Sequence, residues 1–585
     1  MKKRLFRYTR TVVPLTVVAL LVFAGGCSKG TMDGSSPVSN AGDTNQVPPF
    51  TGPDPNQYVN VRQKAADADS YAITYGALTP AVIDTLKTYP LVIVHPYNGN
   101  ITRDQIMWIK QGVKPDDATD NPVVLCYISI GEDSRTYQMT DAQMQADPRF
   151  RGDGTGPTVD PRGPGPSNRS LVGLNPKGTP TNGGYASYYV NDNAVNCPGT
   201  DRARVPDENG NFKTRFVNAG DPLWYATAKE MLMNVDTHTP PGLRELLTSS
   251  YGRGLGCDGV FLDTIDTAAP NRYTTCSDSN HSNSEWTAQG FSNFIASLRS
   301  DSDFPNKVIL QNRGLFFFDP REPHYQVSAM DKIDIGFFES YHLDNDSATT
   351  VSPYYPDNRY NMAPKVMAEA NRHGFKMLSL GYADGFGGPK PGMSLQTLLG
   401  NSGNGFDILL ADIQEASAVG FRHYITNAQV DFVNSFVKSH EVLSDTTPPI
   451  WSSTYNNNYD FPVAAPNANR VGIQKAEVSA DGSVVLSWDV ALDMNRVSYV
   501  LYHMPTPFNF SAAARVPIIQ AALGVGSGYD LVWQAPNPNL ALQSVYPYQF
   551  RIRGLQHGIE YGFAIRAIDS KGNEDNNQVV LTATP

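Results

Sequence analysis

Short apolar runs alternate with amphipathic stretches along much of the chain, from about residue 66 to 443. Each run has the length of one buried strand, and the stretches between several of them have the 3.6-residue period of a helix. Parallel strands covered on both faces are apolar along their whole length. Eight such runs are present: Tyr71–Tyr75, Leu91–His95, Val123–Ile130, Gly259–Asp263, Lys307–Gln311, Ile333–Glu339, Lys376–Gly381 and Gly420–Thr426. The pattern therefore predicts an α/β fold, a (β/α)8 barrel of the TIM type.

Helices are expected at Thr79–Thr88, Ser284–Ser300, Tyr360–His373 and Asp407–Val419. The connection from the third to the fourth strand is much longer, about residues 131–255, and its middle, 147–220, is dense in Gly, Pro, Asn and Asp. It leaves the carboxyl end of a strand, so we expect this insertion to cover the face that carries the site in such barrels. Its aromatic side chains either stack on a ligand or pack the insertion onto the barrel: Tyr185, Tyr188, Tyr189, Trp224 and Tyr225.

Alternation with a period of two replaces the helical period after Asp445–Pro449. The clearest strand-like segments are Val484–Trp488, Val497–Tyr502, Gln549–Arg553 and Tyr561–Asp569. With turn signals such as Lys571–Gly572–Asn573, they predict an antiparallel sandwich over residues 450–585.

The first 27 residues have the pattern of an export signal. Basic residues precede a short apolar stretch, Val12–Phe23, and small residues lead to Cys27. The stretch is too short for a membrane span. Ala24–Cys27 resembles a bacterial lipoprotein box, which implies a lipid on Cys27 and, with Ser28 following, a place at the outer membrane or cell surface. Ordinary secretion is the alternative. Residues 28–65 are then expected to form a flexible linker.

The charge balance argues against nucleic acid as a partner. The chain carries a formal charge of −11, and removal of the five basic residues of the signal would take it to −16. Such a chain repels other polyanions. With 585 residues, 40% of them hydrophobic, the chain is long enough for two or three domains, each with its own core.

Four cysteines remain besides Cys27, and no two of them have the spacing of a metal site. We therefore expect no metal and no organic cofactor. Cys126 and Cys257 lie in or beside apolar strands and are expected to be small buried hydrophobic residues. Cys197 and Cys276 lie in polar sequence and are the favoured disulfide pair in an oxidising compartment.

Two predicted strands end abruptly in a carboxylic acid, at Asp263 and Glu339. In a parallel barrel both acids would lie on the catalytic face. Paired carboxylates are the minimum requirement for glycoside hydrolysis. We expect Asp263 to act as nucleophile or charge stabiliser and Glu339 as general acid/base, with the reverse assignment left open. For either acid alone, a helix cap or loop acid is an equally good interpretation. Glu132 also follows a strand and is the main competitor, although substrate binding is preferred for it.

Other nucleophile or phosphate signatures are missing from the sequence: there is no Gly-x-Ser-x-Gly elbow, P-loop or His-Glu-x-x-His helix. Polar and aromatic residues near the strand ends are instead candidates for substrate binding, against the alternatives of simple packing or helix capping. They are Glu132, Tyr127, Asp266, Gln311, Asn312, Tyr341, Tyr382 and His95.

Four motifs resemble glycoside hydrolase family 114, the endo-α-1,4-polygalactosaminidase-like enzymes: Val124–Glu132, Gly256–Asp266, Val308–Asn312 and Phe337–Ser340. The resemblance covers most of residues 70–426 of the predicted barrel, residues 66–443, and implies Asp263 and Glu339 as the catalytic pair. One departure is His95, which ends the second strand where the family pattern has an aspartate; it affects the expected substrate more than the reaction. The C-terminal region resembles a fibronectin type III domain through Trp488 and the pair Leu555 and Tyr561.

These features together predict an exported, lipid-anchored, monomeric glycoside hydrolase. The family resemblance implies internal cleavage of a polysaccharide that contains amino sugars. A non-catalytic surface protein that binds glycan through the barrel and mediates adhesion is the main alternative. A hydrolase for an unrelated glycan is a third.

Overall fold

The computed structural model describes most of the barrel and of the C-terminal region. The described residues are 47–96, 101–151, 184–190, 205–210, 212–231, 240–270, 284–320, 322–344, 351–352, 354–383, 404–440, 446–451, 472–488, 490–493, 497–518, 529–531 and 548–585. Cys27, Cys197 and Cys276 lie outside them, so the expected signal, lipid site and Cys197–Cys276 pair remain predictions.

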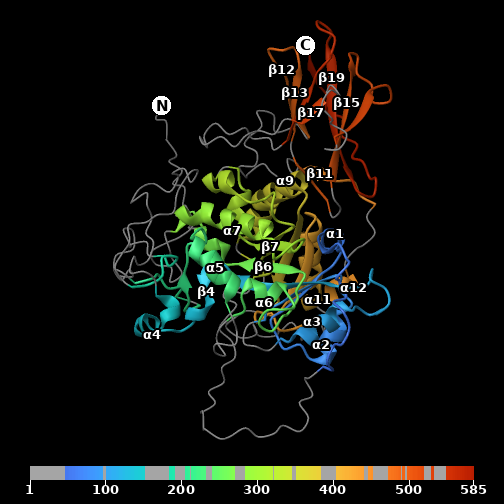
Figure 1. Cartoon of the computed structure of the whole chain (residues 1–585). Helices are drawn as coiled ribbons and strands as arrows, with labels where there is room; N and C mark the ends of the chain where they lie inside the picture. The colour runs from blue at the N-terminus through green and yellow to red at the C-terminus, as the bar shows by residue number, and fades with distance from the viewer. Residues whose placement is uncertain are drawn as a thin grey trace, which may run out of the picture.

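Eight parallel strands form a (β/α)8 barrel of the TIM type, as the sequence predicts (Figure 1). Their hydrogen-bonded order is β1-β2-β3-β6-β7-β8-β9-β10, which follows the chain. The strands are β1 (Ala72–Thr74), β2 (Leu91–Val94), β3 (Val123–Ser129), β6 (Gly259–Asp263), β7 (Val308–Asn312), β8 (Ile335–Glu339), β9 (Lys376–Tyr382) and β10 (Arg422–Thr426). Each one coincides with a predicted apolar run to within a few residues, because burial on both faces selects apolar residues at every position.

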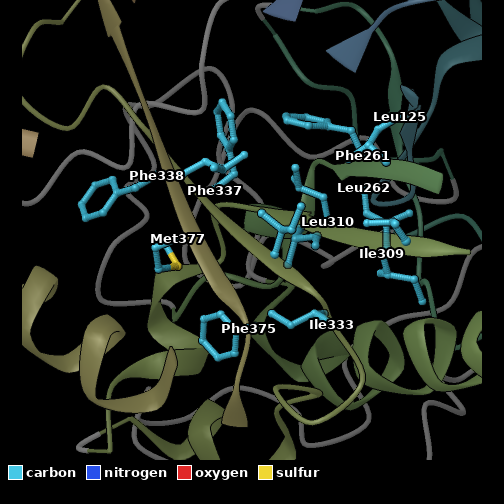
Figure 2. Packing of buried hydrophobic residues seen from close by; sticks show 14 of the residues in the cluster. Leu125, Phe261, Leu262, Ile309, Leu310, Ile333, Phe337, Phe338, Phe375 and Met377 are labelled. Carbon is cyan, nitrogen blue, oxygen red and sulfur yellow. The ribbon is translucent and has the colours of Figure 1, made fainter. Parts of the chain in front are cut away.

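Strands β1 and β10, the first and the last in this order, lie close to each other. The Tyr75 amide, just after β1, donates to the Val430 carbonyl at 2.6 Å. The Tyr71 and Tyr424 rings lie 5.7 Å apart. Inside the barrel the Phe261 and Phe337 rings meet edge to face at 5.1 Å. Figure 2 shows part of this packed interior and the layer around it. The barrel is therefore filled by side chains and has no central pore.

Helices cover the outside of the barrel (Figure 1). Their starts are marked by caps in the sequence, as at α3, where Thr102 and Gln105 form a capping box. The α-helices are α1 (Val61–Asp67), α2 (Pro80–Leu86), α3 (Arg103–Lys110), α4 (Asp141–Ala146), α5 (Pro222–Glu230), α6 (Leu243–Leu247), α7 (Ala288–Ser300), α8 (Tyr355–Asp357), α9 (Ala363–His373), α11 (Asn404–Ser417) and α12 (Phe436–His440). Shorter helical turns are η2 (Ser134–Thr136), η3 (Pro148–Phe150), η5 (Ile265–Ala268), η7 (Glu285–Thr287), η8 (Leu315–Phe318), η9 (Pro323–Val327) and η10 (Asn358–Met362).

The end of the expected flexible linker lies against the barrel. Asn56 is buried and its amide donates to Asp258 Oδ2 and to the Pro122 carbonyl, both at 2.8 Å. Asp54 pairs at 2.6 Å with Lys110, which is fully buried. The composition of residues 47–60 suggests a free tether, but a few specific polar contacts hold this segment in place. The predicted flexible linker, residues 28–65, therefore extends too far along the chain, because its last part belongs to the fold.

Described parts of the insertion are tied to the barrel by a small antiparallel sheet. Strands β4 (Glu132–Asp133) and β5 (Arg215–Phe216) pair with each other. Tyr188 and Trp224 are buried with their rings 5.1 Å apart, and Trp224 donates to the Ile130 carbonyl at 2.9 Å. These aromatic residues therefore pack the insertion onto the barrel, which is the second of the two predicted roles.

The C-terminal region forms two four-stranded antiparallel sheets, ordered β12-β13-β18-β17 and β16-β15-β19-β20, as the alternating pattern predicts. Buried residues of both sheets share one cluster that includes Trp488. The Tyr561 hydroxyl accepts a hydrogen bond from the Gln556 amide at 3.2 Å. The strands are β11 (Ile450–Trp451), β12 (Ile473–Val478), β13 (Val484–Trp488), β14 (Ala491–Leu492), β15 (Val497–Pro505), β16 (Ala514–Ile518), β17 (Tyr529–Leu531), β18 (Tyr548–Ile552), β19 (Tyr561–Asp569) and β20 (Leu581–Ala583).

This region contacts the barrel at the edge opposite its carboxyl ends. Gly420 lies two residues before β10, and a Cβ added there would be 2.5 Å from the Asp493 carbonyl oxygen. Only glycine allows this approach, with a φ of +88°. The contact between Gly420 and Asp493 therefore lies at the amino end of β10, away from the carboxyl edge of the barrel strands.

A disulfide joins Cys126, in the middle of β3, to Cys257, just before β6. Both residues are fully buried, as expected, but the prediction that they are separate small hydrophobic residues is wrong. Strands β3 and β6 are neighbours in the barrel although 131 residues separate the two cysteines. The pattern of the sequence does not show that neighbourhood, because the long insertion lies between the strands.

We predict that replacing Cys126 and Cys257 together by alanine lowers the free energy of unfolding by about 2–5 kcal/mol, because the disulfide closes a long loop in the unfolded chain. Urea unfolding of the full chain, followed by tryptophan fluorescence, measures the change. The native chain, unfolded under the same non-reducing conditions, is the reference. An unchanged midpoint and slope in the double variant would show that the bond does not stabilise the barrel.

Candidate active site

The two predicted acids end alternate strands of the barrel and lie on its inner side. Asp263 ends β6 and Glu339 ends β8. Side chains alternate along a strand, so each acid shares the inward face with the phenylalanine two positions earlier, Phe261 or Phe337. Because those two rings are in contact at 5.1 Å, they form an apolar floor beneath the acids. Both carboxylates therefore lie at the carboxyl edge of the strands, on top of a packed aromatic layer.

One amide nitrogen connects the acids. Asn312 ends β7, the strand between them, and its Nδ2 donates to Asp263 Oδ1 at 2.7 Å and to Glu339 Oε2 at 3.1 Å. The two bond lengths together limit the separation of these two oxygens to 5.8 Å. The sequence predicts Asn312 as a residue that binds sugar hydroxyls. In the structure both of its amide hydrogens are directed at the carboxylate pair, so Asn312 holds the two acids.

Two tyrosine hydroxyls complete the chain of hydrogen bonds. Tyr127 on β3 donates to Asp263 Oδ2 at 2.6 Å, and Tyr382 on β9 donates to Glu339 Oε1. Five consecutive strands of the barrel thus contribute one inward side chain each: Tyr127, Asp263, Asn312, Glu339 and Tyr382. Tyr127 and Tyr382 are sequence candidates that the structure brings to the pair.

The environment of Glu339 favours its protonated form. Burial and the charge of Asp263 raise its pKa from 4.5 to about 7, although the hydrogen bonds from Tyr382 and Asn312 and the charge of Arg313 act in the opposite direction. Glu339 is only 4% exposed, whereas Asp263 is partly exposed. One acid is therefore poised to carry a proton near neutral pH, and its partner is accessible from the solvent side.

The backbone turns sharply just beyond the functional side chains. Thr264, Arg313 and Ser340 follow the last residues of β6, β7 and β8, and their φ angles are +62°, +52° and +55°. Non-glycine residues rarely adopt this region, which costs of order 1–3 kcal/mol each and is enriched at functional sites. Thr264 is held there by its side chain, which accepts from the Gly131 amide at 2.7 Å.

The sequence did not single out Tyr75, which lies at the same edge after β1. Its ring is 5.7 Å from the Tyr127 ring and 4.8 Å from the His95 ring. Burial, together with the charges of Asp263 and Glu339, raises the pKa of Tyr75 well above its usual range. In the sequence, Tyr75 is a tyrosine at the end of an apolar run, and a tyrosine that only packs against the core has the same pattern.

His95 lies behind Tyr127, with the two ring centroids 4.1 Å apart. Burial lowers its pKa to about 3, so the imidazole is neutral at physiological pH. Together with Tyr127, Ser129 and Ser134 it lines a small hollow closed by Met231 and Pro240. His95 thus supports the tyrosine that contacts Asp263.

Two predicted binding residues lie away from the carboxylates. Gln311 precedes Asn312 on β7 and therefore points to the opposite face, where its amide donates to the Arg313 carbonyl at 3.1 Å. Tyr341 is fully buried and packs edge to face on Phe338 and Phe421 at 5.3 and 5.0 Å. Gln311 and Tyr341 are therefore packing residues, and their predicted binding role is not supported.

Two further candidates, Asp266 and Glu132, are occupied by other contacts. Asp266 accepts from the Gly314 amide at 3.0 Å and pairs with Arg313 at 3.0 Å, so it fixes the turn after β7. Glu132 accepts from Asn209 Nδ2 at 2.8 Å and from the Thr214 hydroxyl. Burial raises the pKa of Glu132 to about 7 despite these bonds. Glu132 therefore anchors the insertion, and both its oxygens already have partners.

Among the described residues there is no cluster of three or more His, Cys, Asp or Glu side chains that could hold a metal ion. Within the same residues, none of the helices combines the length and the apolar character that crossing a membrane requires.

No family model matches the chain, and no curated protein matches it. A modular endo-beta-1,4-mannanase from Cellulomonas fimi is similar over 90% of this chain and 95% of its own, with 11% identity and a TM-score of 0.30. The fn3 domain of human contactin 1 matches 20% of this chain and 76% of its own, with 13% identity and a TM-score of 0.12. The FN1–FN3 domains of chicken CNTN1 match 19% of this chain, with 12% identity and a TM-score of 0.13. The match spans only 30% of that chicken chain.

We predict that Glu339→Gln is more stable than the native chain above neutral pH. The folded state binds the Glu339 proton more tightly than the unfolded state does, so its contribution is fully favourable below pH 4.5 and declines as the pH rises towards 7. A pKa change of this size corresponds to roughly 3 kcal/mol at most.

Melting temperatures of the native chain and the variant from pH 4 to 8 measure this effect. The gap between them should widen in favour of Glu339→Gln as the pH rises. Glu477→Gln, at a position that is 63% exposed, is the matched control and should leave the profile unchanged. A constant gap would mean that Glu339 titrates normally in the folded protein.

Proposed function

We propose that this protein is a glycoside hydrolase whose catalytic pair is Asp263 and Glu339. The observation that carries the proposal is the Asn312 amide, which holds one oxygen of each strand-end carboxylate within 5.8 Å of the other on an apolar floor. A protonated acid beside an ionised one is the arrangement that cleavage of a glycosidic bond requires.

The limit of 5.8 Å between the facing oxygens of Asp263 and Glu339 favours a retaining mechanism. Retaining enzymes hold their carboxyl groups roughly 5–5.5 Å apart, whereas inverting enzymes need roughly 6.5–9.5 Å to admit a water molecule. Asp263 attacks the anomeric carbon while Glu339 gives its proton to the departing glycosidic oxygen, and a glycosyl ester forms on Asp263. Glu339 then takes a proton from water, the water oxygen attacks the same carbon, and the ester bond to Asp263 breaks.

The neighbouring residues suit these steps. Tyr127 and Asn312 each donate to Asp263 and fix the direction from which it attacks. The Tyr382 hydroxyl contacts Glu339 in both of its states, because a hydroxyl donates to a carboxylate and accepts from a protonated carboxyl. The aromatic floor excludes water from below, so that the proton of Glu339 is directed to the open side of the site.

For the substrate we propose a polysaccharide that contains amino sugars, cut internally. The sequence resemblance to the polygalactosaminidase-like family supports this choice. The local charge also supports it: the carboxylate of Asp263 is partly exposed, and the neighbouring cation, Arg313, is paired with Asp266 at 3.0 Å. Such a site attracts a sugar that carries an ammonium group. We further propose that the chain acts outside the cell on a lipid anchor at Cys27, as a monomer, with the C-terminal sheets as a spacer.

We predict that the full chain releases reducing ends from α-1,4-linked galactosamine polymers and that product size falls before monosaccharide accumulates. Glu339→Gln and Asp263→Asn should each lower kcat by about 10²–10⁴-fold, because each removes one of the two catalytic groups. A reducing-end assay on this polymer and on other exopolysaccharides measures the loss, with Glu477→Gln as the control.

The outcomes of this assay separate the alternatives. Full activity in either variant removes that residue from the pair. Cleavage of a different polymer alone keeps the reaction and rejects the amino-sugar substrate. Measurable glycan binding without turnover of any polymer identifies a non-catalytic surface protein and rejects the proposal.

We also predict that the first product keeps the anomeric configuration of the substrate. Proton NMR spectra recorded in the first minutes of the reaction, before mutarotation, show which anomer forms. The opposite anomer would mean that water enters between the two acids and that the site opens beyond the spacing fixed by Asn312.

A further inference from the structure

A second buried network lies behind the site, on the outward faces of β9 and β10. Asp412 on α11 is fully buried and accepts from His423 at 2.7 Å, from His342 at 3.1 Å and from the Leu343 amide at 3.3 Å. His423 in turn contacts the Ser379 hydroxyl at 2.8 Å. A carboxylate only accepts hydrogen bonds, so His342 Nδ1 and His423 Nε2 both carry protons.

Asp412 is ionised in this position. Burial raises its pKa, but the neighbouring His423 and the hydrogen bonds from both histidines outweigh burial and bring the pKa to about 2. Ser379, His423 and Asp412 have the contacts of a hydrolase triad, yet all three side chains are buried and no substrate reaches them. The network therefore serves the structure around it.

A glycine in β9 leaves room for the Asp412 carboxylate. A Cβ added to Gly381 would lie only 2.0 Å from Asp412 Oδ2, so any other residue at this point of β9 would displace the acid. On α11, Leu409 and Ile413 lie on either side of Asp412 in sequence and pack in one buried cluster with Leu343, which fixes the helix against the strands.

These contacts lead directly to the acid/base of the site. Asp412 binds residues 342 and 343, three and four positions after Glu339, and touches Gly381, which precedes Tyr382. The same two segments are joined by backbone bonds from Tyr341 to Leu380 at 3.4 Å and from Tyr382 to Leu343 at 3.3 Å. Asp412 therefore clamps the chain after β8 to the end of β9, the two places that carry Glu339 and the tyrosine bonded to it.

We propose that Asp412 is a positioning residue for the acid/base: it sets the contact between Tyr382 and Glu339 without touching the substrate. The proposal rests on the proposed function for its effect on turnover, but its effect on the titration of Glu339 does not depend on that function. Loss of the clamp lets Tyr382 move away from Glu339, and the carboxylate form loses a hydrogen bond.

The decisive experiment is a titration of the Glu339 carboxyl in the full chain, labelled with ¹³C-glutamate and followed by NMR. The signal is identified by its disappearance in Glu339→Gln. The native transition is expected near pH 7. Tyr382→Phe should move it to higher pH, Asp412→Asn should move it in the same direction by at least about half as much, and the double variant should move it no further than Tyr382→Phe alone.

Activity is measured on the same variants. Asp412→Asn should lower kcat by about ten- to a hundredfold with little change in KM, because the acid is misplaced while the substrate contacts remain. Ser379→Ala removes only the outer hydrogen bond to His423 and is the matched control, expected to change neither the titration nor kcat.

A second pair of variants covers the case in which Asp412→Asn does not fold. His342→Leu removes one donor to Asp412 and should reproduce the shift, whereas His342→Asn offers an amide nitrogen in its place and should restore the native titration. The proposal is overturned if folded Asp412→Asn or His342→Leu leaves the Glu339 transition at its native pH while Tyr382→Phe moves it. If the native chain cleaves no glycan, the proposed function fails, and the titration still decides the role of Asp412.

Discussion

A single hydrogen-bond donor between two carboxylates is the constraint on which the rest of the site depends. Asn312 Nδ2 contacts Asp263 at 2.7 Å and Glu339 at 3.1 Å, and it can do so only because β7 lies between β6 and β8 with all three side chains on the inner face. Two acids this close cannot both ionise easily above an aromatic floor, so one of them keeps its proton near neutral pH. The strand order, the alternation of side chains and the packing of Phe261 on Phe337 together place the two acids on either side of Asn312.

The barrel also shows how such a site is supported from behind. Left-handed residues at Thr264, Arg313 and Ser340 redirect the chain directly after the functional side chains. Thr264 accepts a hydrogen bond from the Gly131 amide, Arg313 pairs with Asp266, and the segment after Ser340 contacts Asp412, so each unfavourable turn is held by a polar contact. Marginally stable proteins keep such conformations only where the surroundings enforce them. The inner face carries the chemistry, and the outer face carries the contacts that fix its geometry.

The sequence predicts the eight strands and both acids because each is a local pattern: an apolar run that ends in a carboxylate. It fails where the outcome depends on which residues meet in space. Gln311 and Asn312 are adjacent and chemically alike, yet only the inward one reaches the acids. Cys126 and Cys257 form a disulfide although 131 residues separate them, so the sequence gives no sign that they are close in space. Asn56 turns a segment of linker composition into part of the fold through two hydrogen bonds. Tyr75 and Asp412 had no sequence pattern that separates them from packing and surface residues.

The most direct test of the central claim is to trap the covalent intermediate. The full chain is treated with an activated fluorinated amino sugar that forms the glycosyl ester quickly and releases it slowly, and the modified peptide is identified by mass spectrometry. A sugar attached to Asp263, at a stoichiometry that matches the loss of activity, is the result that the account predicts. Attachment to Glu339 or Glu132, or continued turnover with no adduct, would contradict it.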